Sequence, residues 1–201
     1  ILSGKTETLQ IQIPDLHVCY STELLREVSA AENAAHPQRN IIGIIAQTTK
    51  MQEKAAEVLA LLPAAPYAKI MPALEAEMVK YIGNCFLYSK VVMMNTFYDT
   101  VTAAGGDWET VRTAIAKDSR IGASHTDPIH DTGRGAGGHC FIKDFEAFRQ
   151  FHKEQVSNVQ AEEMLSSMVA YNNHLLINSG KNLDLLTGVY GEELLKKLQK
   201  Q

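Results

Sequence analysis

Residues 133–144 place a cysteine and two charged side chains directly after a run of glycines. The segment is Gly-Arg-Gly-Ala-Gly-Gly-His-Cys-Phe-Ile-Lys-Asp, and an apolar, helix-like stretch follows it. Glycine is common where the backbone turns sharply or approaches a ligand closely. A cysteine between such a loop and a helix start feels the positive end of the helix dipole, which favours the thiolate. We therefore interpret Cys140 as a nucleophile. The alternative is a small buried apolar side chain, the commoner role of a lone cysteine.

Two polar pairs could serve this cysteine. Asp144 follows Cys140 by one helical turn and has Lys143 beside it, although an acidic residue in the first turn of a helix is also common for structural reasons. Lys80 and Asn84 lie four residues apart in a long helical pattern and so share one face. A lysine and an asparagine on so apolar a helix need partners or water, because burying them alone is costly. The alternative is an ordinary polar stripe.

The glycines also fit the pattern G-x-G-x-x-G at residues 133–138. A dinucleotide-binding loop of this kind must follow a buried strand and open a helix within a βαβ unit. The preceding residues, 125–130, are His-Thr-Asp-Pro-Ile-His and do not resemble such a strand. We therefore reject the cofactor-binding interpretation of this loop.

From residue 72 onward the pattern is helical only. A pattern over 73–104 predicts one long helix, which Gly105 and Gly106 end. Its apolar positions cover much of the circumference, which predicts a central, mostly buried helix. Further helices are expected at 108–117 and at roughly 141–155, 159–178 and 189–199, with a loop at 118–139. The apolar positions of the long helix are Leu74, Met78, Ile82, Cys85, Phe86, Val91 and Val92.

Before residue 72 short strands and helices alternate. Residues 40–46 form a continuous apolar, β-branched run, which is typical of a buried strand in a parallel sheet. Residues 49–62 have a helical pattern, which Pro63 ends. This order resembles the second half of a doubly wound α/β domain, with too few strands for a whole one. The other expected elements are an extended run at 17–20, a turn capped by Thr22 that carries Glu23 and Glu27 on one face, and an edge strand at 68–71.

The sequence thus predicts a partial α/β doubly wound domain at 1–71 and an all-α domain at 72–201 built on one long helix. The 201 residues carry 19 basic and 23 acidic side chains, a net charge of −4, which argues against nucleic-acid and anionic-membrane partners. Three cysteines at scattered positions fit free thiols in a reducing cytoplasm. No Cys-x-x-Cys pair or histidine spacing typical of metal ligands is present, so no metal site is expected.

Five separated motifs, in the same order, resemble those of the UDP-glucose 6-dehydrogenase and GDP-mannose dehydrogenase family. The resemblance extends over residues 1–172 and identifies the chain as a member of that family. The motifs are Ser-Thr-Glu-Leu-Leu-Arg-Glu at 21–27, His-Pro-x-Arg-x-Ile-Ile-Gly at 36–43, the segment 75–90 with Asn95, Asp-Ser-Arg-Ile-Gly at 118–122, and Gly-Gly-His-Cys-Phe-Ile-Lys-Asp at 137–144.

The resemblance implies an NAD-dependent oxidation, in two steps, of the C6 alcohol of a UDP- or GDP-linked sugar to a carboxylate. Cys140 would attack the aldehyde intermediate, and the resulting thiohemiacetal would be oxidised to a thioester that water cleaves. Lys80 would stabilise the developing oxyanion. Asn84 and Asp144 would hold a catalytic water, and Glu23 would assist the hydrolysis.

The resemblance also implies binding roles and a fold. Residues 1–71 would be the C-terminal half of a Rossmann-like NAD-binding domain. Residues 72–201 would be the central substrate and dimerisation domain, similar to the C-terminal domain of 6-phosphogluconate dehydrogenase, with a homodimer through helix 73–104. Arg120 would contact the substrate, and Glu27 and Lys143 would lie near the nicotinamide of NAD. The glycines expected to wrap the sugar are Gly133, Gly135, Gly137 and Gly138.

Departures from the family pattern define what is expected of these residues alone. The strand and G-x-G-x-x-G turn that hold the NAD pyrophosphate are missing, as is the third domain that closes over the nucleotide. The chain is therefore expected to be a truncated enzyme, inactive by itself; the alternative is a non-catalytic dimerisation or assembly module derived from the family. The sugar stays open, because His139 resembles the acetamido-sugar branch whereas Phe141 follows the glucose branch. Uronic acid precursors of capsule, exopolysaccharide or other glycans are all compatible.

Overall fold

The computed structural model describes residues 4–25 and 29–193. It divides into two compact units, residues 1–82 and 83–201. The long helix α4 (Ala73–Ala103) contributes its first turns to one unit and its remainder to the other. Within the described residues, no helix is both long enough and apolar enough to cross a membrane.

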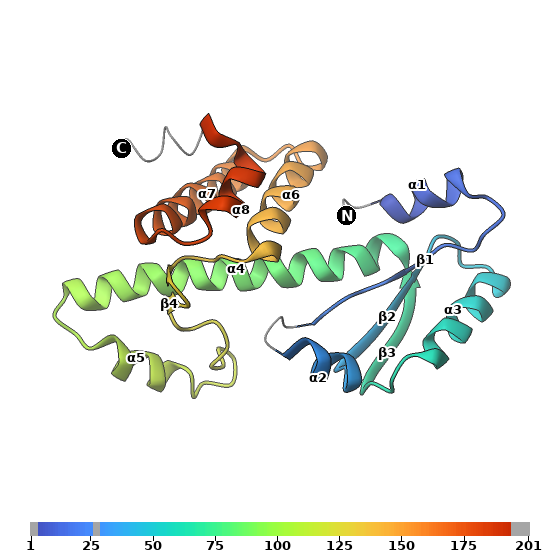
Figure 1. The fold of residues 1–201 in the computed structure, drawn as a ribbon, viewed down its shortest axis with the longest axis horizontal. Coiled ribbons are helices and arrows are strands. Elements are labelled where there is room, and N and C mark those ends of the chain that lie inside the picture. The colour runs from blue at the N-terminus through green and yellow to red at the C-terminus, as the bar shows by residue number, and fades with distance from the viewer. Residues whose placement is uncertain (1–3, 26–28, 194–201) are drawn as a thin grey trace. The chain divides into compact units, whose positions relative to one another are not determined.

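A three-stranded sheet forms the centre of the first unit (Figure 1). Strand β2 (Arg39–Ile44) lies between β1 (Cys19–Ser21) and β3 (Tyr67–Pro72). It pairs antiparallel with β1 and parallel with β3. The predicted buried strand and its parallel, edge-strand neighbour are thus confirmed. The long apolar run of β2 follows from burial on both faces, because Ile41, Ile42 and Ile44 are all almost inaccessible to solvent.

Helix α3 (Thr49–Leu61) covers one face of this sheet. Met51 and Ala55 pack against Ile42 and Ile44 of β2. The helix begins where Thr48 accepts a hydrogen bond from the Met51 amide, as a capping threonine does. The predicted helix at 49–62 is therefore confirmed to within one residue.

A second helix of this unit, α1 (Lys5–Gln12), was not expected from the sequence. Its start is held by Glu77 from the first part of α4, which is 1% exposed. The carboxylate accepts hydrogen bonds from the backbone and hydroxyl of Thr6, at 3.1 and 2.6 Å. The amphipathic pattern of α1 is weak, so the sequence gives little sign of a helix there. Glu77, a distant residue in the sequence, satisfies one of the first backbone donors of α1.

The expected turn capped by Thr22 is wrong for the residues that the structure describes. Residues 22–25 are not helical, and the next helix, α2 (Ala30–Ala35), begins later. The Thr22 hydroxyl instead donates a hydrogen bond to the carbonyl oxygen of Ala76 at 3.3 Å. A tertiary contact has therefore replaced the local cap, and Glu27 lies outside the described residues.

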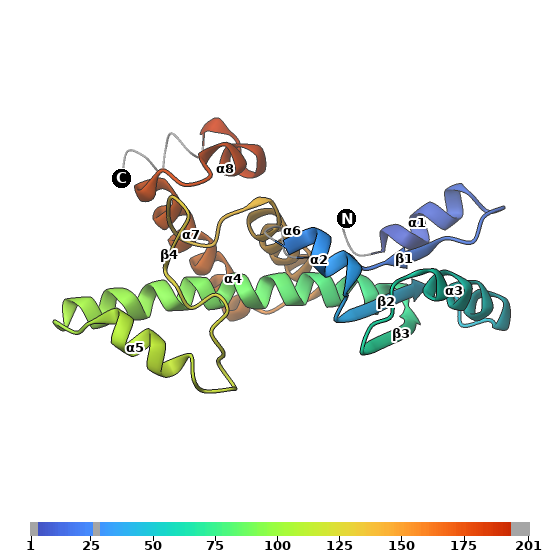
Figure 2. The same cartoon turned by 60° about the horizontal axis from the view of Figure 1, so that its bottom comes forward.

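The second unit is helical apart from a short hairpin in the loop that precedes Cys140. The end of α4 is followed by α5, which folds back along it (Figures 1 and 2), with Trp108 edge-on to Tyr98 at 6.0 Å between ring centroids. The other elements are α5 (Trp108–Ile115), β4 (Ile129–His130), β5 (Gly133–Arg134), α6 (His139–Gln155), α7 (Val159–Ser179) and α8 (Leu183–Tyr190).

Helix α8 was not expected from the sequence. Gly180 ends α7 in the left-handed conformation, and Gly191, which also has a positive φ, follows the last residue of α8. Leu186 is buried against Ile142 and Leu176, which packs α8 on α6 and α7. Of the helix expected at 189–199, residues 192 and 193 are helical, and residues 194–199 lie outside the described residues.

The core of the second unit forms where α4, α6 and α7 meet. Tyr88 and Phe145 stack with their ring centroids 3.9 Å apart, and Leu165 of α7 closes the same cluster. The expectation that α4 is buried around most of its circumference is wrong, because Ile82 and Phe86 are 55% and 68% exposed. Leu74 is a further exposed position on α4 among the described residues.

Candidate active site

Cys140 is the second residue of α6 and has an exposed, free thiol. The residue that precedes the helix, Gly138, has φ +85°, a conformation that residues with a side chain rarely adopt. Glycine is therefore required where the loop turns into the helix. This local geometry leaves the thiol accessible at a helix N-terminus, where a nucleophile needs to be.

Asp144 lies one turn after Cys140 on α6 and is 4% exposed. Its two carboxylate oxygens accept hydrogen bonds from different side chains. Asn84 of α4 donates to Oδ2 at 2.7 Å, and Lys143 donates to Oδ1 at 2.6 Å. The structure thus brings together three predicted site residues from segments that are 60 positions apart in sequence. A buried carboxyl group held in this way is orientated, so it can bind and polarise a water molecule.

The neighbouring cysteine, Cys85, is buried beneath the same turn. Its thiol faces the backbone oxygen of Asp144 at 3.9 Å. Burial, reinforced by the nearby charge of Asp144, raises the pKa of the Cys85 thiol from 9.0 to about 12. Cys85 is therefore a core residue, and of the two thiols in this unit only Cys140 is placed to act as a nucleophile.

Lys80 and Glu23 form an ion pair within the first unit. The Lys80 ammonium lies 2.7 Å from Oε2 of Glu23, while Oε1 of Glu23 accepts the Leu25 amide at 2.7 Å. Lys80 stands one helical turn before Asn84 on α4. Two predicted site residues are thus in direct contact, and Glu23 orientates the ammonium.

Arg120 extends from the loop after α5 and its side chain is 88% exposed. It binds both carboxylate oxygens of Asp118, and these hydrogen bonds lower the pKa of Asp118. Lys90 of α4 fixes the following residues by donating to the carbonyl oxygens of Ile121 and Gly122, at 2.8 and 3.3 Å. The backbone of the loop is therefore attached to α4 while the Arg120 side chain stays accessible.

The glycines at 133–138 pack closely on their own chain. A Cβ atom at Gly133 would overlap the Ser179 side chain, and one at Gly137 would overlap Asn182. A Cβ at Gly138 would meet nothing within 4 Å. Close approach to the turn after α7 thus accounts for two of the four glycines, whereas a role of all four in wrapping a sugar stays a prediction.

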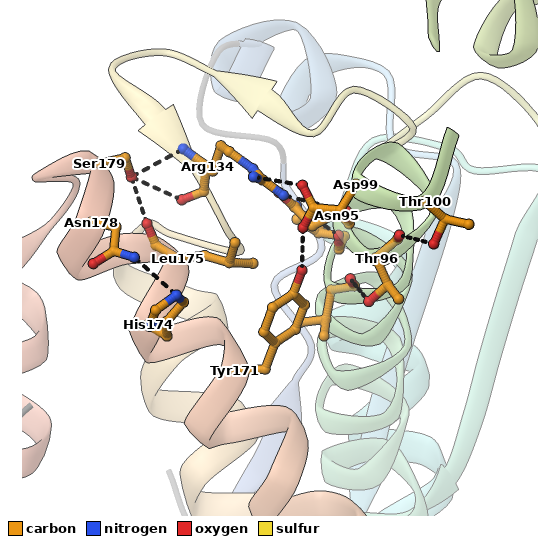
Figure 3. Close-up of polar contacts among 12 residues, drawn as sticks. Asn95, Thr96, Asp99, Thr100, Arg134, Tyr171, His174, Leu175, Asn178 and Ser179 are labelled. Atoms are coloured by element: carbon orange, nitrogen blue, oxygen red, sulfur yellow. Dashed lines mark hydrogen bonds and ion pairs between the residues drawn. The ribbon is translucent and has the colours of Figure 1, made fainter. Parts of the chain in front are cut away.

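Arg134, inside the glycine loop, forms a network that the sequence interpretation missed (Figure 3). Its guanidinium binds Oδ1 of Asn95 at 2.9 Å and Oδ1 of Asp99 at 2.9 Å, both on α4. Tyr171 of α7 donates to the second oxygen of Asp99, also at 2.9 Å. Hydrogen bonding to Arg134 lowers the pKa of Asp99. The spacing of Asn95 and Asp99, four apart on one helix face, was the available signal.

Two groups are relevant to NAD, the Lys143 ammonium and the start of α3. The Lys143 side chain is half-exposed and its ammonium donates to Asp144, which leaves further donors for another acceptor. At the start of α3, Thr48 accepts the Met51 amide, which satisfies one of the first backbone donors of that helix. Among the described residues, His, Cys, Asp and Glu side chains do not gather in a group that could hold a metal ion.

Known proteins resemble this chain in both sequence and fold. Residues 74–174 match the model of the "UDP-glucose/GDP-mannose dehydrogenase family, central domain". UDP-glucose 6-dehydrogenase AglM of Haloferax volcanii is 35% identical over 137 residues, which cover 66% of this chain and 30% of that protein. UDP-glucose 6-dehydrogenase YwqF of Bacillus subtilis is 32% identical over 185 residues, 89% of this chain and 38% of that protein.

A solved structure, that of a UDP-glucose dehydrogenase from the hyperthermophilic archaeon Pyrobaculum islandicum, shares the fold. It aligns with a TM-score of 0.72 and 28% identity, over 89% of this chain and 41% of that one. The chain thus spans less than half the length of each of these three relatives.

Proposed function

The chain belongs to the UDP-glucose/GDP-mannose dehydrogenase family, and from this premise we propose that it carries the catalytic nucleophile of an NAD-dependent nucleotide-sugar 6-dehydrogenase. The observation that carries the proposal is the hydrogen bond between Asn84 and Asp144, one helical turn after the exposed thiol of Cys140. A nucleophile and a buried carboxylate at the start of α6, with an amide of α4 bound to the carboxylate, are groups that can form and hydrolyse a thioester.

The part of the reaction proposed for Cys140 begins on the C6 aldehyde, which the first oxidation of the sugar alcohol produces. The sulfur of Cys140 forms a bond to the carbonyl carbon, and the proton passes to the carbonyl oxygen, which gives a thiohemiacetal. Loss of a hydride and a proton converts this adduct into a thioester. Water then adds to the thioester carbonyl and the thiolate departs, leaving the carboxylate. Bound NAD+ would supply the hydride acceptor for both oxidations.

The other side chains are proposed to act on charge and water. Asp144 and Asn84 hold the attacking water, and the carboxylate receives its proton. The Lys80 ammonium stabilises negative charge on the sugar oxygen, and its ion pair with Glu23 keeps it orientated. Glu23 also assists the hydrolysis.

The binding roles are extended from the same family. Arg120 would contact the nucleotide sugar through its exposed guanidinium, and the glycines at 133–138 would wrap the sugar. Lys143 and Glu27 would lie at the nicotinamide end of NAD. The first unit would represent part of a Rossmann-like domain, and the second the central helical domain. The nucleotide, UDP or GDP, and the sugar stay open.

The decisive test separates the chemistry of Cys140 from binding of the cofactor. The chain is incubated with the C6 aldehyde of UDP-glucose and then alkylated with iodoacetamide, and each cysteine is quantified by mass spectrometry. Thiohemiacetal formation should protect Cys140 in proportion to the aldehyde concentration, whereas Cys19 should be alkylated as before. UDP-glucose itself, an alcohol that forms no bond to sulfur, is the matched control and should protect Cys140 far less. Equal protection of Cys19, or none of Cys140, would refute the proposal.

A second experiment follows NADH with NAD+ and a panel of UDP- and GDP-sugars. We expect no turnover from these residues alone, because residues 1–71 contain no G-x-G-x-x-G turn to hold the pyrophosphate and NAD should bind weakly. NADH formation that disappears in Cys140→Ala, but persists in the control Cys19→Ala, would overturn that expectation and still support the nucleophile.

The second candidate function, a dimerisation module, is favoured by the exposed apolar side of α4. Phe86, Met93 and Phe97 are 68%, 43% and 44% exposed and lie seven and four residues apart, on one face of the helix. The occupant proposed is a second copy of this chain, because the same face of two copies can bury itself by two-fold symmetry.

Sedimentation at micromolar concentration tests this candidate function. The chain should sediment as a dimer, Phe86→Glu should be a monomer, and the control Ile11→Glu, at an exposed position on α1 (80%), should stay dimeric. A monomeric unmodified chain would count against it.

A further inference from the structure

The backbone of the glycine loop is held by side chains from the end of α7 and the turn before α8. Backbone amides at every second residue of the loop, 134, 136 and 138, each donate to a side-chain oxygen from this region. A loop of this composition would otherwise have few fixed partners, since glycine supplies no side chain. The pairs are Arg134 with Ser179 Oγ at 3.1 Å, Ala136 with Asn172 Oδ1 at 2.7 Å, and Gly138 with Asn182 Oδ1 at 2.9 Å.

Lys181, in the same turn, binds the loop through its carbonyl oxygens. The side chain is 5% exposed, and its ammonium donates to His130, Gly133 and Gly135 at 2.9, 3.3 and 3.3 Å. An ammonium has three hydrogens, so these carbonyls use all of its donors. Burial lowers the pKa of Lys181, while the charge of Asp131 acts in the opposite direction. Burying an ammonium group is costly unless it is hydrogen-bonded. The carbonyl oxygens of the loop provide these hydrogen bonds to Lys181.

The shapes of the turn and the loop also match. A Cβ at Gly137 would approach the Lys181 side chain to 2.9 Å as well as overlapping Asn182. Asn182 itself adopts the left-handed conformation, with φ +52°, and its side-chain oxygen accepts the Gly138 amide. On its other side the loop is tied to α4 by Arg134 (Figure 3). The loop just before Cys140 is therefore held on one side by the turn between α7 and α8 and on the other by α4.

The turn at residues 179–182 lies outside the segment that matches the family model, which ends at residue 174. We propose that the turn Ser179–Asn182 is the seat of the glycine loop, and that Lys181 and Asn182 are positioning residues that hold Cys140 in place for reaction. The assignment of Cys140 as the group being positioned rests on the proposed function; the seat itself does not.

Amide hydrogen exchange on the whole chain, resolved by residue, tests the seat. Lys181→Met removes the ammonium but leaves Ser179 and Asn172, the acceptors of the Arg134 and Ala136 amides, untouched. Both amides should nevertheless exchange about tenfold faster, because the loop opens more often. Asn182→Gly, which keeps the left-handed backbone, should do the same at Gly138, and Asn182→Asp, which keeps the Oδ1 acceptor, should restore protection.

The matched control is Asn158→Gly, which removes the cap of α7 and so destabilises the same unit without touching the loop. Its loop amides should exchange as in the unmodified chain, relative to the global opening rate. Loop amides that are unprotected in the unmodified chain, or that do not respond to both Lys181→Met and Asn182→Gly, would overturn the seat.

The link to Cys140 has its own readout. In Asn182→Gly, the concentration of UDP-glucose C6 aldehyde that half-protects Cys140 from iodoacetamide should rise about tenfold, the effect of about one lost hydrogen bond, and Asn182→Asp should return it. An unchanged concentration would refute positioning even if exchange responds. If the aldehyde protects Cys140 in no variant, including the unmodified chain, the proposed nucleophile fails, and hydrogen exchange alone decides the seat.

Discussion

Cys85 should be almost inert to alkylation in the folded protein, and fully reactive once the chain is unfolded. Its thiol is 7% exposed and its pKa is raised from 9.0 to about 12. A rise of this size lowers the thiolate fraction at pH 8 about a thousandfold, since each pH unit is a factor of ten and the thiolate is the reactive form. Steric burial slows direct attack in the same direction.

The assay compares each cysteine with itself. The chain is pulsed with iodoacetamide at pH 8, folded and in urea, and the alkylated peptides are quantified by mass spectrometry. Cys85 should react at least about a thousandfold more slowly when folded, unless local opening of the α4–α6 contact sets a faster limit. Cys140, already exposed in the folded chain, should change by less than about tenfold. Asn84→Ala, which removes a contact from α4 to Asp144, should speed the reaction of Cys85 more than that of Cys140.

A result in which folded Cys85 reacts within tenfold of Cys140 would refute the reasoning. It would mean that the turn carrying Asp144 does not cover Cys85, and the same contact positions Asn84 against Asp144. The candidate site would then have lost the geometry on which its chemistry rests.

Three further outcomes concern stability. Raising the pH from about 9 to about 12 should progressively lower the urea midpoint. Cys85 and Tyr88 have folded-state pKa values above their ordinary 9.0 and 10.0. The unfolded chain therefore ionises first, and the stability that is present below pH 9 is lost as the pH rises. Phe145→Ala, which removes a ring that is 1% exposed, should destabilise the second unit by about 3–5 kcal/mol in urea unfolding, and Phe145→Leu by clearly less. Thr48→Ala should lower the stability of the first unit by about 1 kcal/mol, whereas Thr48→Ser, which keeps the capping oxygen, should have little effect.

Sequence motifs predicted the contacts of the site between residues that are close in sequence. Cys140 and Asp144 share one helix start, and Lys80 and Asn84 share one helix face, so their spacing alone predicted that each pair lies together. The contact between Asn84 and Asp144 followed only from resemblance to a family, because 60 residues separate them. The residues that hold the loop were missed altogether. Lys181 and Arg134 are ordinary charged residues in the sequence, and their role depends on which carbonyls and carboxylates come within reach.

The errors have a common physical origin. Thr22 was expected to cap a turn, but the carbonyl of Ala76 offers it a tertiary partner instead. Phe86 was expected to be buried because it is apolar, yet burial depends on whether another element covers that side of α4. Helix α8 was missed, because the hydrophobic partners of Leu186 lie on α6 and α7.

The sequence by itself therefore determined what short-range forces decide. These are the buried strand β2, the extent of α4, the starts of α3 and α7, and the glycine-to-helix junction at Cys140. Hydrogen bonds and side-chain periodicity over a few residues are enough to specify such features. Only the tertiary structure decided which buried groups neutralise one another and what holds the glycine loop before Cys140. Those contacts join segments that are far apart in sequence, and packing of the whole chain brings these segments together.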